Sequence, residues 1–411
     1  MTIATDIHAD LITPLGAYLR LRADGAAGFL LESVEKGRLG RYSLVGAGAR
    51  LVSFEQAEHE LAAGRPVVGY LGYDHVATLE PTVPLPADGA GLPESRFVVA
   101  DVLVRFDHAA SVAEVLTGDR DAVAGVLERP LDGENDFVPV KHKRTRRFPS
   151  QRAYEAGVRR AKEHIRLGDA YQIVLSQRAE RATDVSALAL YRSLRHINPS
   201  PYHFLLELGD VALVGSSPET LVKLEGRRAS VNPIAGTTEP GVGDAEHLLA
   251  SEKDRAEHVM LVDLGRNDLS RVCRPGTVRV GRFLEAERYS HVTHLVSEVT
   301  GELRPECGAF DLLRACFPAG TVSGAPKVRA MQIISELEGY RRGPYAGAVG
   351  YALPDGAFDT CIAIRTVVLA DGLARLQAGA GIVADSEPAA EHEECLRKLA
   401  ALELALEEAE G

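Results

Sequence analysis

The sequence predicts an α+β fold in which a large, mostly antiparallel β-sandwich is flanked by helices. Strand-like segments outnumber helix-like segments, and several follow one another with no helix between them. Such runs are typical of antiparallel sheets, whereas a doubly wound parallel sheet needs a helix after each strand. Hydrophobic residues make up 45% of the 411 residues and charged residues 25%, as in an ordinary globular chain with a large core.

The composition argues against several classes of protein. The formal net charge of −12 argues against a general nucleic-acid binder. The N-terminus shows neither the basic segment nor the apolar core of a signal peptide, and no apolar run approaches the roughly 18 residues of a membrane span. The five cysteines are scattered without a C-x-x-C pair, which argues against a zinc site or a disulfide framework. We therefore expect a cytoplasmic protein.

The chain divides into an N-terminal region at 1–130, a linker at 131–149 and a C-terminal region at 150–411. Apolar segments broken by glycine and small polar residues predict strands and turns in the N-terminal region, with a further strand at 96–106. The linker contains Gly133, Pro139 and Pro149 and carries a basic run at 141–147. We interpret this run as solvated; the alternative is a patch that binds anions or nucleic acid.

Apolar residues at helical spacing predict an amphipathic helix at 150–167, with Ser150 as its N-cap. We expect further helices at 325–337 and 389–409, and a helix-sized segment at 252–270 that ends in a polar stop at 265–268. The predicted strands of the C-terminal region are 171–176, 211–215, 227–231, 346–353, 357–369 and 374–378.

Two pairs of carboxylates are spaced for one helix face. Asp254 and Glu257 stand three residues apart, as do Glu391 and Glu394, and residues at this spacing are neighbours on a helix. Two such pairs could share one Mg²⁺, which prefers oxygen ligands. The alternative is that both pairs are solvated charges at helix ends.

Glycine-rich segments form two further candidate sites. The segment 320–327 turns into a helix and ends in Lys327, which suits an anion, although a tight turn with a solvated lysine is equally compatible. The segment 379–384 formally matches a dinucleotide fingerprint. However, 385–388 breaks the helix that should follow, so we interpret it as a wall where ligand lies close to backbone.

Three single residues are candidates for a catalytic or binding role, and each also has a structural alternative. Arg365 is expected inside a strand, on one face with two small residues, Cys361 and Ala363, where it could grip a carboxylate or form a buried ion pair. His294 lies in an apolar strand and is a general base or a structural histidine. Glu219 follows a strand and is a general acid or caps a turn.

Together these segments resemble the chorismate-utilising enzymes, and most closely their anthranilate synthase component I branch. The resemblance covers nearly the whole chain and is strongest from 148 to 398. Its motifs stand in one order at 168–172, 217–219, 233–237, 253–268, 320–327, 343–351 and 379–394. It implies the family's sandwich with outer helices and conversion of chorismate and ammonia to anthranilate and pyruvate through an aminodeoxyisochorismate intermediate, the first step of tryptophan biosynthesis.

The resemblance also assigns site residues. It implies Mg²⁺ held by Glu257 and Glu394, with Asp254 and Glu391 nearby, and a catalytic set of Glu219 as acid, His294 in the elimination step, and Thr321. The chorismate contacts that it implies are Gly236, Thr237, Thr321, Tyr345, Arg365, Gly379, Ala380 and Gly381.

Two positions separate branches of the family. Water-adding relatives carry a lysine where Gln172 stands, and many aminodeoxychorismate synthases carry a nucleophilic lysine where Ala235 stands. Aminodeoxychorismate synthase component I therefore remains the nearest alternative, and a non-catalytic regulator that binds chorismate or tryptophan is the alternative from another class.

The N-terminal run 30–33 resembles the tryptophan-sensing motif of the family. The feedback site that this implies contains Ser33, Pro201, Tyr202 and His203, and the family often has methionine where His203 stands. After Thr237 the family usually runs Arg-Pro-Arg-Gly, whereas this chain has Thr238, Glu239, Pro240 and Gly241. No amidotransferase motif is visible, so we expect a separate glutaminase subunit to supply ammonia from glutamine.

Overall fold

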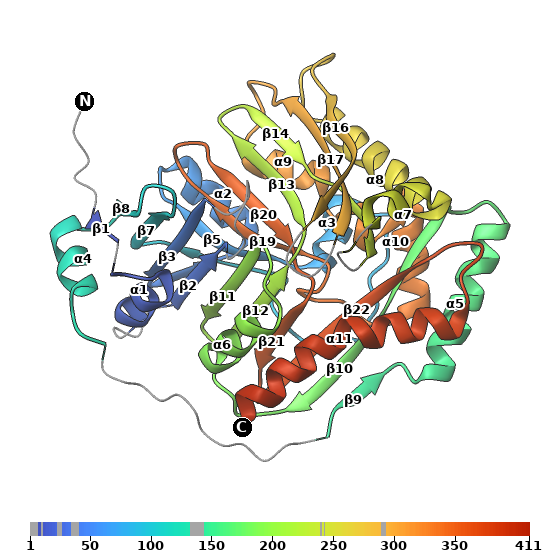
Figure 1. The fold of residues 1–411 in the computed structure, drawn as a ribbon, viewed down its shortest axis with the longest axis horizontal. Helices are drawn as coiled ribbons and strands as arrows, with labels where there is room; N and C mark the ends of the chain where they lie inside the picture. The colour runs from blue at the N-terminus through green and yellow to red at the C-terminus, as the bar shows by residue number, and fades with distance from the viewer. Residues whose placement is uncertain are drawn as a thin grey trace.

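The computed structural model describes residues 7–9, 11–22, 27–33, 41–131, 144–238, 241, 243–288 and 293–411. Within this part of the chain, two antiparallel sheets make up the centre of the molecule (Figure 1). The first, sheet A, has the spatial order β1 (Ile7–His8), β8 (Val112–Thr117), β7 (Val102–Asp107), β3 (Tyr42–Gly48), β2 (Ala27–Glu32), β11 (Tyr202–Leu208), β12 (Val211–Ser217), β21 (Thr366–Ala370), β22 (Leu373–Ile382), β10 (Gln172–Ala182) and β18 (Gly324–Ala325), with β9 (Arg146–Phe148) beside β10.

Sheet B is built from strands of both regions of the chain. Its spatial order is β15 (Ile234–Thr238), β17 (Thr293–Glu302), β14 (Arg228–Val231), β13 (Thr220–Glu225), β20 (Phe358–Ile362), β19 (Ala348–Ala352), β5 (Val67–Leu71), β6 (Ser95–Val99) and β4 (Arg50–Val52), with β16 (Arg279–Arg288) beside β17. Helices flank both sheets, so the predicted fold class is confirmed.

The helices cover the outer faces of the two sheets. The helices packed against sheet A are α1 (Pro14–Leu21), α5 (Gln151–Arg166), α6 (Ala187–Ile197), α10 (Lys327–Glu338) and α11 (Pro388–Glu410), and α4 (Arg120–Leu127) packs beside α1. Those packed against sheet B are α2 (Phe54–Ala62), α7 (Asp244–Ala250), α8 (Glu252–Ser270) and α9 (Ala309–Cys316). Short helical turns complete the described set: α3 (Val76–Leu79), η2 (Tyr73–His75) and η3 (Gly320–Val322). None of the described helices has the length and apolar character that a membrane span requires.

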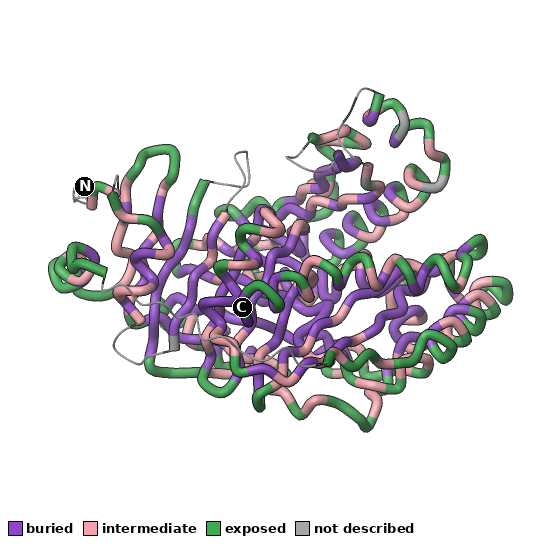
Figure 2. Tube along the Cα trace, turned by 60° about the horizontal axis from the view of Figure 1, so that its bottom comes forward, coloured by how far each residue is buried: buried purple, intermediate pink, exposed green. Residues whose placement is uncertain are grey.

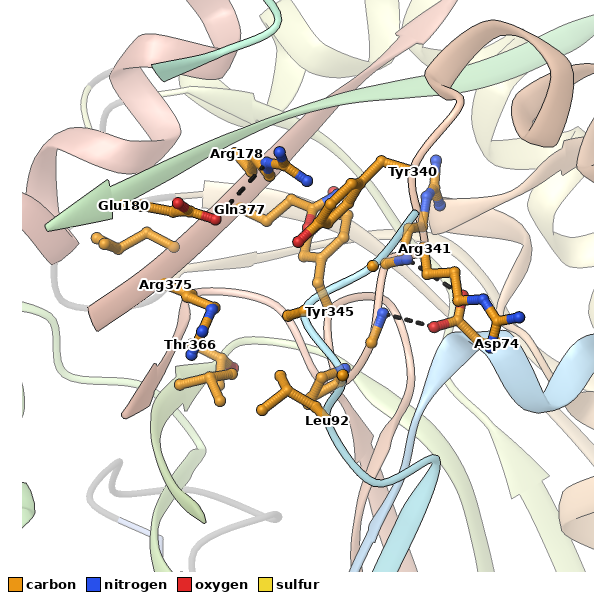
Figure 3. Close-up of a pocket in the computed structure, with 18 of the residues that line it drawn as sticks. Asp74, Leu92, Arg178, Glu180, Tyr340, Arg341, Tyr345, Thr366, Arg375 and Gln377 are labelled. Atoms are coloured by element: carbon orange, nitrogen blue, oxygen red, sulfur yellow. Dashed lines mark hydrogen bonds and ion pairs between the residues drawn. The ribbon is translucent and has the colours of Figure 1, made fainter. Parts of the chain in front are cut away.

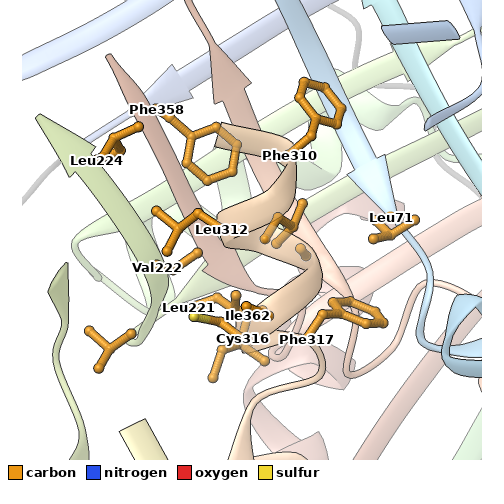
Figure 4. Close-up of a cluster of buried hydrophobic side chains, with 14 of the residues drawn as sticks. Leu71, Leu221, Val222, Leu224, Phe310, Leu312, Cys316, Phe317, Phe358 and Ile362 are labelled. Atoms are coloured by element: carbon orange, nitrogen blue, oxygen red, sulfur yellow. The ribbon is translucent and has the colours of Figure 1, made fainter. Parts of the chain in front are cut away.

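The core lies in layers, with buried residues at the centre of the molecule and exposed ones on its outer helices (Figure 2). Phe29, Phe204 and Leu206 of sheet A meet Tyr70 and Val349 of sheet B between the sheets. A second cluster lies where α9 covers sheet B (Figure 4). Its members include Phe310, Leu312 and Phe317 from α9 and the residue after it, and Val222, Leu224, Phe358 and Ile362 from β13 and β20. Burial of each large apolar side chain contributes roughly 1.5–3 kcal/mol of transfer free energy. The packing of these layers therefore determines how the sheets stack.

Strands from the two regions that the sequence suggests pair with each other. β2 pairs with β11 in sheet A, and β5 pairs with β19 in sheet B. The division at 130 stays a prediction, and residues 132–143 of the predicted linker, which include the start of its basic run at 141–143, lie outside the described residues.

Several predicted elements are confirmed. Ser150 caps α5 by accepting a hydrogen bond from the amide of Ala153, and α5 buries Tyr154, Val158 and Ala161. The segment 252–270 is helical throughout, so its polar stop at 265–268 is wrong: Gly265 lets α8 continue close to β14, where an added Cβ would stand 2.8 Å from the side chain of Val231.

Two predicted strands are each divided into two. The segment 96–106 forms β6 and β7 in different sheets, and 357–369 contains β20 and most of β21, again in different sheets. The alternation of apolar and polar residues does not show where a strand leaves one sheet for the other, because the side-chain period is the same in both.

Candidate active site

Two segments cross between the sheets side by side. Pro218 and Glu219 join β12 of sheet A to β13 of sheet B, and 363–365 joins β20 of sheet B to β21 of sheet A. The amide of Ile362 donates to the carbonyl of Glu219 at 3.0 Å, and the amide of Ser216 donates to the carbonyl of Arg365 at 3.1 Å. The predicted acid and the predicted carboxylate-binding arginine therefore lie on adjacent, hydrogen-bonded backbone.

The placement of Arg365 inside a strand is wrong. It lies in the second crossing with φ of 49°, a left-handed conformation that a non-glycine residue rarely adopts, so the expected alternation with Cys361 and Ala363 does not exist. Its Nη1 donates to Oδ1 of Asn198 at 3.4 Å, and burial lowers its pKa. Because the chain turns at Arg365, its cationic side chain points in a direction that it would not have in a continuous strand.

Glu219 is a buried carboxyl with a defined hydrogen-bond partner. It is 6% exposed, and the hydroxyl of Thr321 donates to its Oε1 at 2.6 Å. Burial raises the pKa of Glu219 to about 8, opposed by the Thr321 hydrogen bond and increased by the nearby charge of Glu257. Glu219 therefore holds a proton at neutral pH and can act as an acid.

His294 sits opposite a glycine bulge. The register of β15 against β17 shifts between Ala235 and Thr237, and Gly236 occupies the shift with φ of 65°. The ring Nδ1 of His294 lies 3.0 Å from the carbonyl of Gly236, which can only accept, so Nδ1 carries the proton and Nε2 is the basic nitrogen. Burial, and secondarily the charge of Arg365, lowers the pKa of His294. The side chain of Thr237 lies outside the described residues.

The predicted glycine wall is the end of β22 facing β10. Ser176 pairs with Gly379, Leu175 with Ala380 and Val174 with Gly381. A Cβ at Gly379 would stand 2.8 Å from the hydroxyl of Tyr345, and one at Gly381 would stand 2.2 Å from Nε2 of Gln172. Glycine at these positions is required by close approach of side chains.

Three of the predicted metal-binding carboxylates line one cavity. Glu257 of α8 and Glu391 and Glu394 of α11 surround a cavity of about 1050 Å³ with Gln172 and Gly381. The amide of Gln172 donates to Oε1 of Glu257 at 3.0 Å, and Lys398 pairs with Glu394 at 2.7 Å.

Asp254 stands apart from this cavity, beside Gly236, where an added Cβ would lie 3.3 Å from the Cβ of Asp254. Within the described residues, no three Asp, Glu, His or Cys side chains gather closely enough to hold a metal ion. The donor chemistry of Glu257, Glu391 and Glu394 fits Mg²⁺, while a shared shell needs α8 and α11 to draw together.

The four residues predicted for inhibitor binding line a second pocket of about 340 Å³ between the sheets. Ser33 follows β2, and Pro201, Tyr202 and His203 lie at the start of β11. The hydroxyl of Tyr202 lies 2.7 Å from Oγ1 of Thr220, whereas the ring of His203 packs edge-on against Tyr191 of α6 and accepts the amide of Ser200 at 3.1 Å. His203 thus holds, through Ser200, the loop from which Pro201 lines the pocket.

Comparison with known proteins identifies this arrangement. The model of the chorismate binding enzymes matches residues 21–403. The chain belongs to this family. It is 46% identical to anthranilate synthase component 1 of Thermus thermophilus, with 98% of this chain and 97% of the relative covered, and 45% identical to that of Streptomyces coelicolor, with 98% and 88% covered.

Solved structures of chorismate binding enzymes share the fold. Anthranilate synthase component I of Streptococcus pneumoniae superimposes with a TM-score of 0.81 at 33% identity, covering 96% of this chain and 98% of the other. The menaquinone-specific isochorismate synthase of Escherichia coli does so with a TM-score of 0.77 at 22% identity, covering 97% and 92%, and shows the fold alone.

Two residues near the sites of this chorismate binding enzyme were missed by the sequence patterns. Lys398 donates to the carbonyl of Gly379 at 2.8 Å while pairing with Glu394, so it connects α11 to the glycine wall; its spacing of four residues from Glu394 was the available signal. Asp359 lines the pocket between the sheets, and burial raises its pKa to about 6. No sequence signal marks Asp359, since an acidic residue in a strand is ordinarily solvated.

Proposed function

We propose that this chain is the large subunit of an anthranilate synthase. It converts chorismate and ammonia to anthranilate, pyruvate and one water. The observation that carries the proposal, beside the full-length relatives, is the amide of Gln172 held 3.0 Å from Glu257. An amide cannot accept a proton from water at neutral pH, so this position favours ammonia, which needs no activation, as the nucleophile.

Glu219 supplies the acid that protonates the leaving ring hydroxyl. Its pKa of about 8 leaves most of it protonated at neutral pH. Because the Thr321 hydroxyl donates to Oε1, the acidic proton lies on Oε2. Thr321 therefore orients the acid, and an acid with a pKa near the working pH transfers its proton most effectively.

His294 and Arg365 act on the other parts of the substrate. Nε2 of His294 takes the ring proton as the ring C–O bond breaks and the ring becomes aromatic. The enolpyruvate that is released takes up a proton to give pyruvate. The lowered pKa keeps the imidazole neutral and able to accept that proton. Arg365, cationic in a half-buried position, binds a substrate carboxylate through its planar guanidinium.

Mg²⁺ is part of the proposal, with Glu257, Glu391 and Glu394 as the residues that hold it. It supplies Lewis-acid chemistry by offsetting the charge of a substrate carboxylate. Lys398 balances Glu394 at 2.7 Å and holds Gly379 by its carbonyl, so this lysine keeps α11 and the glycine wall at a fixed separation.

The proposal includes a partner and a regulator. The names of the relatives, component 1, support a second component, for which a glutaminase that delivers ammonia is the proposed role. Tryptophan is the proposed inhibitor, and the pocket that contains Ser33, Pro201 and Tyr202 is its proposed site. A cytoplasmic location completes the proposal, supported by five cysteines that are all free thiols.

The test is anthranilate fluorescence after adding chorismate, Mg²⁺ and an ammonium salt at mildly alkaline pH. We expect anthranilate and pyruvate in equal amounts, loss of both with EDTA, and inhibition by tryptophan. Chorismate consumed without either product would instead indicate an aminodeoxychorismate synthase, and untouched chorismate, with the second component also supplied, would contradict enzymatic function.

A further inference from the structure

A buried arginine outside the predicted site residues is tied to several of them. Arg342 follows α10 and is 4% exposed. Its guanidinium donates to both carboxylate oxygens of Glu338, at 2.9 Å from Nε and 2.6 Å from Nη2. The same group donates to two backbone carbonyls, from Nη1 to Val322 at 2.7 Å and from Nη2 to Val174 at 2.8 Å. All of its nitrogens are therefore engaged.

The partners of this ion pair frame the proposed substrate site. Val322 follows Thr321, the residue that orients Glu219. Val174 stands opposite Gly381 in the sheet. Glu338 in turn accepts hydrogen bonds from the amide and the hydroxyl of Ser176, both at 2.8 Å, and Ser176 stands opposite Gly379. One buried pair thus fixes the turn at 320–322 relative to the strands that form the glycine wall.

The pair also lies beside Tyr345. The guanidinium carbon of Arg342 is 5.6 Å from the ring centre of Tyr345 and 4.5 Å from that of Tyr73. Behind Tyr345 lies a cavity of about 330 Å³, which Figure 3 shows lined by Tyr340, Thr366 and other side chains. The side of the Tyr345 ring that faces the cavity has no packing contacts, so the ring is held by the contacts on its other sides. Arg342 is one of these contacts, and Asp74 holds the adjoining turn through the amides of Arg342 and Gly343.

We propose that Arg342, paired with Glu338, is a positioning residue for the reaction: it sets the distance between Thr321, the glycine wall and Tyr345, and so the fit of chorismate. This inference rests on the proposed function. A buried ion pair often adds little to stability because desolvation offsets its attraction. Here the hydrogen bonds of the pair go to segments of the substrate site, so its principal effect is geometric.

The test compares Arg342→Lys with a matched control, Arg181→Lys. Arg181 is 6% exposed and pairs with Glu407 and Glu410 of α11 at 3.0 and 3.2 Å, at the far end of β10 from the glycine wall. Lysine keeps the charge but has no planar fork, so it cannot hold two carbonyls and a carboxylate together. Both variants should lose similar thermal stability.

The kinetic results should differ between the two variants. We expect Arg342→Lys to lower kcat/KM for chorismate by about 10²-fold, chiefly through KM, since a displacement of about 1 Å has costs of this size. Arg181→Lys should leave kcat/KM within about twofold, because Arg181 lies far from the glycine wall and substitutions at distant sites have independent effects. Equal kcat/KM values in the two variants would overturn the proposal and leave Arg342 a structural residue.

A second variant covers the case in which Arg342→Lys does not fold. Glu338→Gln keeps the shape and one acceptor for Ser176 but removes the charge, and we expect a smaller rise of KM in the same direction. An unchanged KM in this variant would also count against the proposal. If the wild-type chain consumes chorismate without making anthranilate, the proposed function fails while positioning is still measured, as the KM for chorismate consumption.

Discussion

The proposed substrate site and the pocket between the sheets are built from the same two sheets in different ways. The proposed substrate site lies where the chain crosses from one sheet to the other, and it contains Gly236 and Arg365 at positive φ together with buried polar groups. The pocket between the sheets is lined by residues in or beside regular strands, such as Tyr202 and Asp359. Segments that cross between the sheets orient their side chains in directions that a regular strand does not allow. Two facing sheets instead leave a pocket between them. If both proposed sites are correct, substitutions in one can leave the other unchanged.

The largest effect should come from Glu219→Gln. The amide keeps the hydrogen bond from Thr321 but has no acidic proton, so we expect kcat to fall by about 10²–10⁴-fold with KM nearly unchanged. Initial rates of anthranilate formation check this. Tryptophan binding, measured by calorimetry, should stay as in the wild type if the two sites are independent; a variant that keeps its rate would remove Glu219 from the reaction.

Arg365→Lys should have the next largest effect. A lysine retains charge but loses the bidentate grip on a carboxylate, worth roughly 1.5–3 kcal/mol for hydrogen bonds to charged groups. We expect KM for chorismate to rise by about 10–100-fold, with inhibition by tryptophan unchanged. Steady-state kinetics over a range of chorismate concentrations test this, and an unaltered KM would show that Arg365 has only a structural pairing with Asn198.

A substitution in the pocket between the sheets should alter inhibition by tryptophan and leave catalysis unchanged. Asp359 lines the pocket between the sheets, so Asp359→Asn should weaken inhibition by tryptophan about tenfold, the loss expected for one charged hydrogen bond, while kcat and KM stay constant. Glu225→Gln is the matched control, because Glu225 lines the same pocket with a side chain that is 60% exposed. Equal effects of the two substitutions would indicate a general charge effect.

The smallest effect should be a pH dependence of inhibition. Burial raises the pKa of Asp359 to about 6, so its carboxylate, the form that attracts an ammonium group, is lost as pH falls through 6. We expect the inhibition constant for tryptophan to rise several-fold between pH 7 and pH 5 in the wild type and to stay flat in Asp359→Asn. Because the folded pKa exceeds the unfolded one of about 3.9, the contribution of Asp359 to stability falls as pH rises through this window. A flat profile in the wild type would exclude this role.

Linear spacing predicted several elements that carry the candidate site, whereas contacts made across the two sheets could not be predicted from it. The helix at 252–270 and the carboxylates of α8 and α11 follow from helical spacing, which depends only on local geometry. The position of Arg365 was mispredicted, because the period of a strand does not reveal a change of sheet. Arg342 was not marked as part of the site, since its partners at 174, 322 and 338 meet it only in three dimensions. Motifs therefore indicate candidate residues, and topology shows which of them lie close together.

The pairing of β2 with β11 and of β5 with β19 has a consequence for how the chain folds during synthesis. Strands near the N-terminus leave the ribosome long before their partners, and translation adds only about 5–20 residues per second. Their unpaired edges therefore wait for seconds, the condition in which strands pair wrongly with other chains. Since non-local pairing also slows folding, sheet B cannot be completed until β20 has emerged, and sheet A not until β21 and β22 have emerged. Production of the intact enzyme should thus depend on slow growth or on chaperones that shield these edges.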